Sequence, residues 1–373
     1  DVMTDNRYTG GLHQGPRRGY MVSAGDLLTN WSLTRRPLML PCNVKQVIGH
    51  PFVITEVAWT NPNLYQSEGP IMLSAYMSLT GVDMACWFHP SAPQWDADPR
   101  FPFGEKNGRK WAGSLPMQMD MFPAAALMFR KGMVARGPVA VREIRRLDAL
   151  FRREPPVIAE SQLFDPNRDE KDLRGSESAE DRVSRLAFLV GPVHVGYDAE
   201  RERVEAADLT PYVDPGAGTV TSNTGQLRMD YRRGLFTVDA PRAQGASGFL
   251  AEAGPVALSD LTIRSENDYA TILAVSMDDR PLSESRKVLL QVGTVTRLTG
   301  FAAEPVTLEQ GDTRVAGLRI VKVGEPPMRI ANTRVCIELN NEHATAATML
   351  DHNGSAAGEV PVARSGPRVT VAL

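Results

Sequence analysis

The sequence is poor in the features that mark several protein classes. Its 373 residues include three cysteines with no Cys-x-x-Cys pair, which argues against a dithiol redox motif and the disulfide framework of a small secreted domain. No apolar run approaches the roughly 18 residues of a membrane-spanning helix. The 41 basic and 44 acidic residues leave a net charge of -3, so charge alone gives no case for binding nucleic acid or a membrane surface. These absences leave an ordinary globular protein with buried or inert thiols.

Sequence motifs with a known catalytic mechanism are also missing. The chain has no Gly-x-Ser-x-Gly nucleophile elbow, no Gly-x-x-x-x-Gly-Lys-[Ser/Thr] phosphate loop, no His-Glu-x-x-His and no Gly-x-Gly-x-x-Gly after a strand. Its six histidines show no spacing typical of metal ligands. We therefore expect neither a metal nor a cofactor.

Two zones of the chain differ in their pattern of apolar and turn-forming residues. In residues 1–153, short apolar runs alternate with patterns of helical length, which is typical of parallel βα units. In residues 154–373, most segments are short, β-branched and separated by Gly, Pro, Asp or Asn, which is typical of serial strands. We expect one domain at 1–153 and a β-sandwich region of one or two small modules at 154–373. The chain begins at Asp1 rather than Met, and we interpret it as a piece of a longer protein.

A strand–helix–strand pattern stands out in the first zone. It predicts a strand over 51–57, a helix within 66–79, where apolar residues recur at helical spacing, and a second strand over 82–88. After a long polar and aromatic loop, the pattern predicts a buried helix over 122–131.

Strand candidates separated by turn signals fill the second zone. Their number and spacing favour a β-sandwich. The candidates cover residues 234–239, 258–264, 270–277, 287–296, 306–309, 314–321, 333–339 and 369–373.

The most informative segment is PFVITEVAWTNPNLYQSEGP, at 51–70. Its strand ends near Glu56, which places a carboxylate at the C-terminal mouth of a parallel sheet, the edge where barrel enzymes keep their active sites. Trp59 and Asn61 follow within five residues, and a carboxylate beside aromatic and amide side chains suits a sugar substrate. The spacing alone leaves a structural alternative open, in which Glu56 is a surface residue and Trp59 fills the core.

Residues 53–88, VITEVAWTNPNLYQSEGPIMLSAYMSLTGVDMACWF, resemble the seventh and eighth strands of clan A glycoside hydrolases. The likeness is to a bacterial group in which a (β/α)8 barrel precedes β-sandwich modules. FPAAAL at 122–127 and GLFTVDAPRAQG at 234–245 resemble the eighth helix and a sandwich element of that group. The resemblance implies an α/β plus all-β fold: a partial (β/α)8 barrel with the last two or three βα units, followed by a β-sandwich region.

The resemblance also implies roles for single residues. In the clan, the Glu that ends the seventh strand is the nucleophile of a retaining glycosidase, and by position this is Glu56. Tyr8 would donate a hydrogen bond to that carboxylate, although Asn6 stands where relatives often carry His. Trp87 would form the floor of the cleaved-sugar subsite, and His89 would reach a sugar hydroxyl; each also fits an ordinary core or loop position. Further loop residues that could line a cleft are Trp95, Asp96, Asp98, Phe101, Phe103 and Trp111.

The acid/base Glu of the clan's fourth strand has no counterpart in this chain, and Glu68 and Glu105 are poor substitutes for it. The resemblance therefore implies a fragment of a glycoside hydrolase with little activity alone, whose full-length parent cleaves an oligo- or polysaccharide. The alternative is a non-catalytic carbohydrate-binding or structural β-sandwich protein. Because relatives of this type are often exported, we expect a periplasmic or extracellular location.

Overall fold

The computed structural model describes residues 1–11, 13–14, 20–89, 98, 100, 106–161, 182–310 and 313–373. Strands make up 42% of it and helices 13%, and the strands are divided among many small sheets. The expected fold, a partial (β/α)8 barrel followed by a β-sandwich region, is therefore wrong. Pairing explains the difference: a barrel needs parallel neighbours joined by crossover helices, whereas most neighbouring strands here are antiparallel.

One small sheet is parallel throughout, with the order β1–β6–β7. Its strands are β1 (Met3–Thr9), β6 (Phe52–Trp59) and β7 (Met84–Trp87), and helix α1 (Glu68–Thr80) connects β6 to β7. The predicted strands over 51–57 and 82–88 and the predicted helix within 66–79 are thus confirmed. Parallel pairing brings the carboxyl ends of all three strands to one edge of this sheet.

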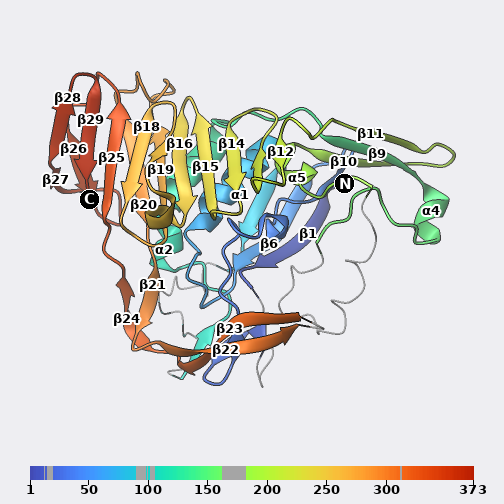
Figure 1. Ribbon diagram of the computed structural model, residues 1–373, viewed down its shortest axis with the longest axis horizontal. Coiled ribbons are helices and arrows are strands. Elements are labelled where there is room, and N and C mark those ends of the chain that lie inside the picture. The colour runs from blue at the N-terminus through green and yellow to red at the C-terminus, as the bar shows by residue number, and fades with distance from the viewer. Residues whose placement is uncertain are drawn as a thin grey trace.

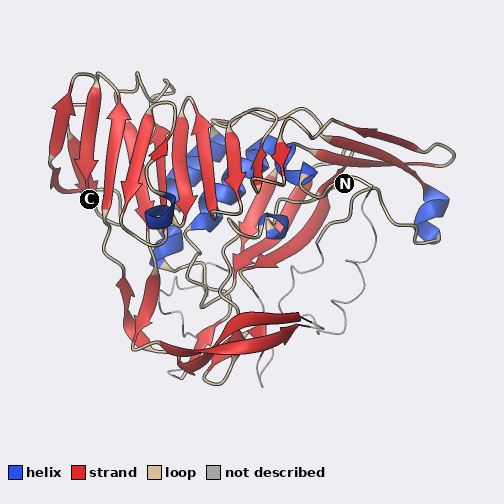
Figure 2. Ribbon diagram, viewed as in Figure 1, coloured by secondary structure: helices blue, strands red, loops and turns tan. Residues whose placement is uncertain are grey.

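Helices α1 and α3 (Phe122–Arg130) lie between this parallel sheet and a seven-stranded sheet, and Figures 1 and 2 show them behind the large sheet. One hydrophobic core spans the three layers, with Ile54 from β6, Ile71 from α1 and Phe236 from the large sheet. The large sheet consists, in spatial order, of β12 (Val213–Asp214), β13 (Thr219–Thr221), β14 (Leu227–Asp230), β15 (Leu235–Ala240), β16 (Ala243–Gly248), β19 (Ala270–Ser276) and β20 (Val288–Gly293).

Strand β19 takes part in two cores because successive side chains of a strand point to opposite faces. Leu273 and Val275 belong to the core around α1 and α3. Ile272 and Ala274 belong to a second core, which they share with Ile337 of a five-stranded sheet. That sheet consists of β17 (Val256–Ala257), β18 (Leu261–Ser265), β25 (Val335–Asn340), β29 (Arg368–Ala372) and β28 (Val362–Ser365).

Two smaller sheets join segments from both sides of residue 153, and the domain division expected there stays a prediction. The first contains β11 (Arg203–Ala206), β9 (Val141–Arg146), β10 (Val193–Asp198) and β5 (Lys45–Val47). The second contains β2 (His13–Gln14), β4 (Leu27–Leu28), β23 (Thr313–Lys322) and β22 (Ala302–Gln310).

The remaining elements are short. The two-stranded pairs are β3 (Met21–Ser23) with β8 (Asn107–Arg109), β21 (Thr296–Thr299) with β24 (Glu325–Ile330), and β26 (Ala347–Leu350) with β27 (Ala356–Val360). The short helices are η1 (Pro37–Met39), α2 (Pro116–Met119), α4 (Leu147–Phe151), α5 (Ala187–Val190) and α6 (Leu250–Ala253). In the part of the chain that is described, no helix has the length and apolar character needed to cross a membrane.

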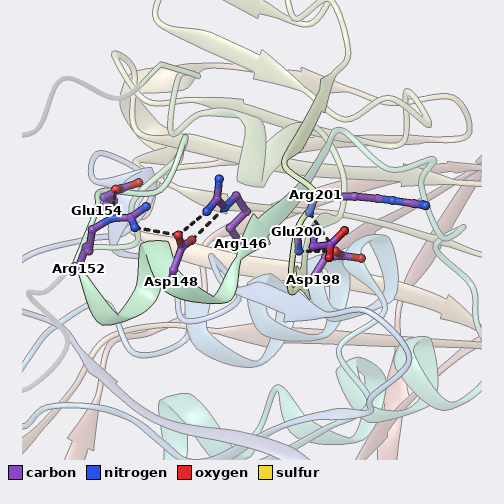
Figure 3. A network of polar contacts seen from close by, with 7 residues as sticks. All are labelled: Arg146, Asp148, Arg152, Glu154, Asp198, Glu200 and Arg201. Carbon is purple, nitrogen blue, oxygen red and sulfur yellow. Dashed lines mark hydrogen bonds and ion pairs between the residues drawn. The ribbon is translucent and has the colours of Figure 1, made fainter.

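Charged side chains cover the projecting ends of β9 and β10 (Figure 3). Asp148 of α4 accepts hydrogen bonds from Arg152 and Arg146, and these hold the pKa of its carboxyl below the ordinary value. Asp198 accepts hydrogen bonds from the backbone N–H groups of Glu200 and Arg201, each at 2.9 Å. Because these groups are exposed, we expect the network to contribute little to stability.

Candidate functional site

A β-bulge at Thr55 and Glu56 interrupts the pairing of β6 with both of its neighbours. Against β1, Ile54 pairs with Asp5 and Glu56 pairs with Asn6. Against β7, a similar shift falls between Ile54 and Val57. Thr55 and Glu56 together therefore take the place of one regular residue, and bulges of this kind re-aim a side chain.

The bulge leaves Glu56 on the face of the sheet that is turned away from α1. Phe52 and Ile54 before it, and Val57 and Trp59 after it, all belong to the core around the helices. A regular strand would not keep Ile54 and Val57 on one face, since they are three positions apart. Glu56 is instead partly exposed on the opposite face.

Tyr8 holds the carboxylate of Glu56. Its hydroxyl donates a hydrogen bond to Oε2, and both side chains are partly buried. Tyr8 pairs with Ala58, two positions beyond the pairing of Asn6 with Glu56, so that both side chains lie on one face of adjacent strands. The predicted contact between Tyr8 and Glu56 is thus present.

Aromatic rings surround Tyr8 on this face. The ring of Trp111 lies 5.0 Å from that of Tyr8, and the ring of Phe88 lies 5.9 Å from it. Tyr20 contacts Trp111 at 5.2 Å and is 63% exposed. We call Tyr8, Tyr20, Phe88 and Trp111 the aromatic cluster. It provides apolar ring surface close to the carboxylate of Glu56.

Trp59 and Trp87 do not lie beside Glu56. Their rings stack on each other at 5.4 Å, and Trp87 also meets Phe122 edge to face at 4.9 Å. Trp59 is 1% exposed, and its Nε1 donates to Oε1 of Glu68 at 3.0 Å. Both indoles therefore pack on the core face of the sheet, as in the structural alternative left open for them.

The other predicted binding residues have local partners. The side chain of Asn6 is exposed, and its Oδ1 accepts a hydrogen bond from Thr55 at 2.7 Å. Asn61 donates to the carbonyl of Arg109 at 3.1 Å and accepts from Gln66 at 2.7 Å. The imidazole of His89 lies 5.1 Å from the ring of Phe88. Of these three residues, only Asn6 is placed by strand pairing on the same face of the sheet as Glu56 and Tyr8.

Glu68, at the start of α1, is a buried carboxylate on the core side of the sheet. It accepts hydrogen bonds from Ser32 at 2.6 Å, from the N–H of Leu33 at 2.8 Å, from Trp59 at 3.0 Å and from Tyr269 at 2.5 Å. Burial raises the pKa of this carboxyl above its ordinary value, while the hydrogen bonds oppose the rise. With no exposed surface, Glu68 cannot meet a substrate.

Within the described ranges, no group of three or more His, Cys, Asp and Glu side chains could hold a metal ion. The three cysteines are free: Cys42 is buried, Cys336 is partly buried, and Cys86 of β7 is exposed. Of the loop residues expected to line a cleft, Trp95, Asp96, Phe101 and Phe103 lie outside the described residues. Asp98 is paired with Arg100 at 3.0 Å, and Trp111 belongs to the aromatic cluster.

Sequence reasoning missed Tyr20 and Phe88. Phe88 follows Trp87 directly, so alternation along the strand signals that the two rings face opposite ways. Nothing in the sequence signals Tyr20, because its position depends on the long-range pairing of β3 with β8.

Comparison of the chain with protein-family models, with curated proteins and with solved structures finds no match.

Proposed function

We propose that the chain is part of a retaining glycoside hydrolase in which Glu56 is the nucleophile. The observation that carries the proposal is the hydrogen bond from Tyr8 to Oε2 of Glu56 at the bulge of β6. A carboxylate nucleophile must be fixed in orientation, and the phenol fixes one oxygen while Oε1 has no partner among the described residues. The exposed ring of Tyr20 and the partly exposed rings of Tyr8 and Phe88 supply surface on which a sugar ring can stack.

The chemistry assigned to Glu56 is nucleophilic substitution at the anomeric carbon. Oε1 attacks that carbon, the bond to the leaving oxygen breaks with its electron pair going to the leaving group, and a glycosyl-enzyme forms. Water then displaces the sugar from the carboxylate. A retaining site also needs an acid/base carboxyl group about 5–5.5 Å from the nucleophile. That role falls to a group outside the described residues.

An activated fluoro-sugar tests the nucleophile without needing the acid/base group. In 2,4-dinitrophenyl 2-deoxy-2-fluoroglycosides, the leaving group departs as a stable phenolate and needs no proton. We expect one of a panel of gluco, galacto, manno and xylo compounds to add one fluoroglycosyl mass to the protein, mapped to Glu56 by peptide mass spectrometry.

Three variants sharpen this experiment. Glu56→Gln should not be labelled, because the amide cannot attack the anomeric carbon. Tyr8→Phe should be labelled about tenfold to a hundredfold more slowly, since it loses one hydrogen bond to a charged group. Glu309→Gln, which changes an exposed carboxylate on β22, serves as the matched control and should behave as wild type. Labelling of another carboxylate, or equal labelling of Glu56→Gln, contradicts the proposal.

The alternative function is carbohydrate binding without cleavage. Tyr20 favours it, because an aromatic ring that is 63% exposed beside a buried tryptophan offers a stacking surface whether or not Glu56 reacts. Binding of a glycan that Tyr20→Ala weakens, together with no labelling of Glu56 by any member of the panel, would support this alternative.

A further inference from the structure

The bulge that carries Glu56 faces a single residue of β7, which is Cys86. Ala85 and Trp87, before and after it, pair with the core residues on either side of the bulge. Because both also pack against the core around the helices, the alternation of β7 turns Cys86 to the other face of the sheet, where it is exposed. Adjacent strands lie about 4.7–4.9 Å apart, so the thiol and the carboxylate of Glu56 are neighbours on this face.

Asn6 of β1 flanks Glu56 on the other side. It pairs with Glu56 across the strands and is exposed. Its Oδ1 accepts a hydrogen bond from Thr55, the other residue of the bulge, at 2.7 Å. Glu56 therefore lies on the central strand of the parallel sheet, between an exposed amide on β1 and an exposed thiol on β7.

The rings of Tyr8 and Phe88 bound this face toward the carboxyl ends of the strands. Tyr8 pairs with Ala58 of β6, and the N–H of Phe88 continues the pairing of β7 with β6 through a hydrogen bond of 2.8 Å. The two rings meet edge to face at 5.9 Å, and Ala58 between them is 3% exposed. Since the rings cover β6 on that side of Glu56, the exposed approach to its carboxylate passes over the residues on its two flanks.

On the basis of the proposed function, we infer that the sugar bound at Glu56 contacts Cys86 and that the small thiol keeps the approach to the nucleophile open. Cys86 takes no part in bond making and acts only through its size, as a specificity-determining residue. Asn6, on the opposite flank, can hydrogen-bond a hydroxyl group of the same sugar through its amide. A bulky side chain at position 86 would fill space next to Oε1 that the anomeric carbon must enter to react.

Labelling by the fluoro-sugar tests the role of this side chain. Cys86→Phe should be labelled at Glu56 at least about tenfold more slowly than wild type, because the ring competes with the sugar for the same space. Cys86→Ser, whose side chain has a similar size, should be labelled at the wild-type rate. Ala356→Phe is the matched control, since it adds a ring at an exposed position of β27, far from β6 (Figure 1).

Charged thiol reagents test the placement of Cys86 beside Glu56 without any sugar. The thiolate attacks a methanethiosulfonate, a disulfide forms, and methanesulfinate leaves with the electron pair. The carboxylate should attract the cationic trimethylammonium-ethyl reagent and repel the anionic sulfonatoethyl reagent. In the ratio of the two rates at Cys86, mapped by mass spectrometry, the intrinsic reactivity of the thiol cancels. Glu56→Gln should lower this ratio by at least about threefold. Glu309→Gln, with the same change in net charge on exposed β22, should leave it unchanged.

The outcomes separate the role of Cys86 from that of Glu56. Equal labelling rates for wild type and Cys86→Phe, or a rate ratio at Cys86 that does not depend on Glu56, would overturn the inference while leaving the nucleophile in place. If no compound of the panel labels wild type, the proposed function itself fails and the inference falls with it. If Cys86→Phe does not fold, wild type modified at Cys86 with benzyl methanethiosulfonate takes its place, and undiminished labelling there is equally decisive.

Discussion

Glu68 shows how one side chain can connect distant parts of the chain. Its carboxylate accepts hydrogen bonds from the 32–33 loop, from β6 through Trp59 and from Tyr269 next to β19. The large sheet, the parallel sheet and α1 are therefore joined at a single buried group. Removing one partner from such a network leaves buried donors unsatisfied, which costs more than the bond itself contributes.

We predict that Glu68 makes stability fall as the pH rises. Burial raises the folded-state pKa above the ordinary value of 4.5, so the folded state holds the proton more tightly than the unfolded state does. The resulting stabilisation is fully present below pH 4.5 and is lost as the pH rises through the folded-state pKa. The neutral variant Glu68→Gln should be destabilised by about 1–3 kcal/mol at low pH, with a gap to wild type that narrows as the pH increases.

Urea unfolding at a series of pH values measures this gap. Glu309→Gln, on an exposed strand, controls for changes in total charge and should follow the wild-type profile. A gap between wild type and Glu68→Gln that stays constant, or that widens with rising pH, contradicts the assigned direction of the shift.

At the scale of elements, the bulge in β6 decides which side chains share a face. It lets the strand keep Ile54 and Val57 in the core while two residues, Thr55 and Glu56, occupy the place of one. Deleting Thr55 would restore regular pairing without moving any core residue to the other face. The deletion therefore tests whether the bulge, or only the alternation along β6, sets the position of Glu56.

We predict that the chain lacking Thr55 folds and is still labelled by the fluoro-sugar. Its core pattern is unchanged, so its Tm should fall by only a few degrees, and Glu56, now alone between Ile54 and Val57, still faces away from the core on the side of Tyr8. Deleting Val53 is the contrasting control, because it moves Phe52 off the core face and should prevent folding. Loss of labelling in the folded variant without Thr55 would mean that the bulge itself, and not the alternation along β6, positions the nucleophile.

At the scale of the whole molecule, the sequence predicts the elements better than their assembly. The strands expected at 270–277 and 333–339 correspond to β19 and β25, because β-branched runs between turn signals are local features. Which strands pair is set by contacts between distant residues, and a resemblance that is strongest in the residues around Glu56 does not decide it. The expected barrel therefore gives way to antiparallel sheets.

The candidate site likewise combines contacts that the sequence predicts with contacts that depend on long-range strand pairing. The contact of Tyr8 with Glu56 was predictable from the likeness of two strand ends. The separation of Trp59 from Glu56 was also open to sequence reasoning, since residues three apart in a strand face opposite ways. The aromatic cluster was not, because Tyr20 reaches Trp111 through the pairing of β3 with β8.

The alternation along β19 leads to a last prediction, about cooperativity. Leu273 packs in the core around the helices and its neighbour Ile272 packs in the second core, so neither core can open without disturbing β19. We expect Leu273→Ala to lower the free energy of unfolding by about 2–5 kcal/mol and Ile272→Val by about 0.5–1.5 kcal/mol, each as a shift of one unfolding transition.

Two probes follow the two cores during urea unfolding. Tryptophan fluorescence, with Trp59 in the core around the helices, reports on that core. Alkylation of Cys336 on β25, mapped by mass spectrometry, reports the other. The urea midpoints from the two probes should coincide in wild type and move together in both variants. Alkylation of Cys336 at a lower urea concentration than the fluorescence change would mean that the two cores unfold independently.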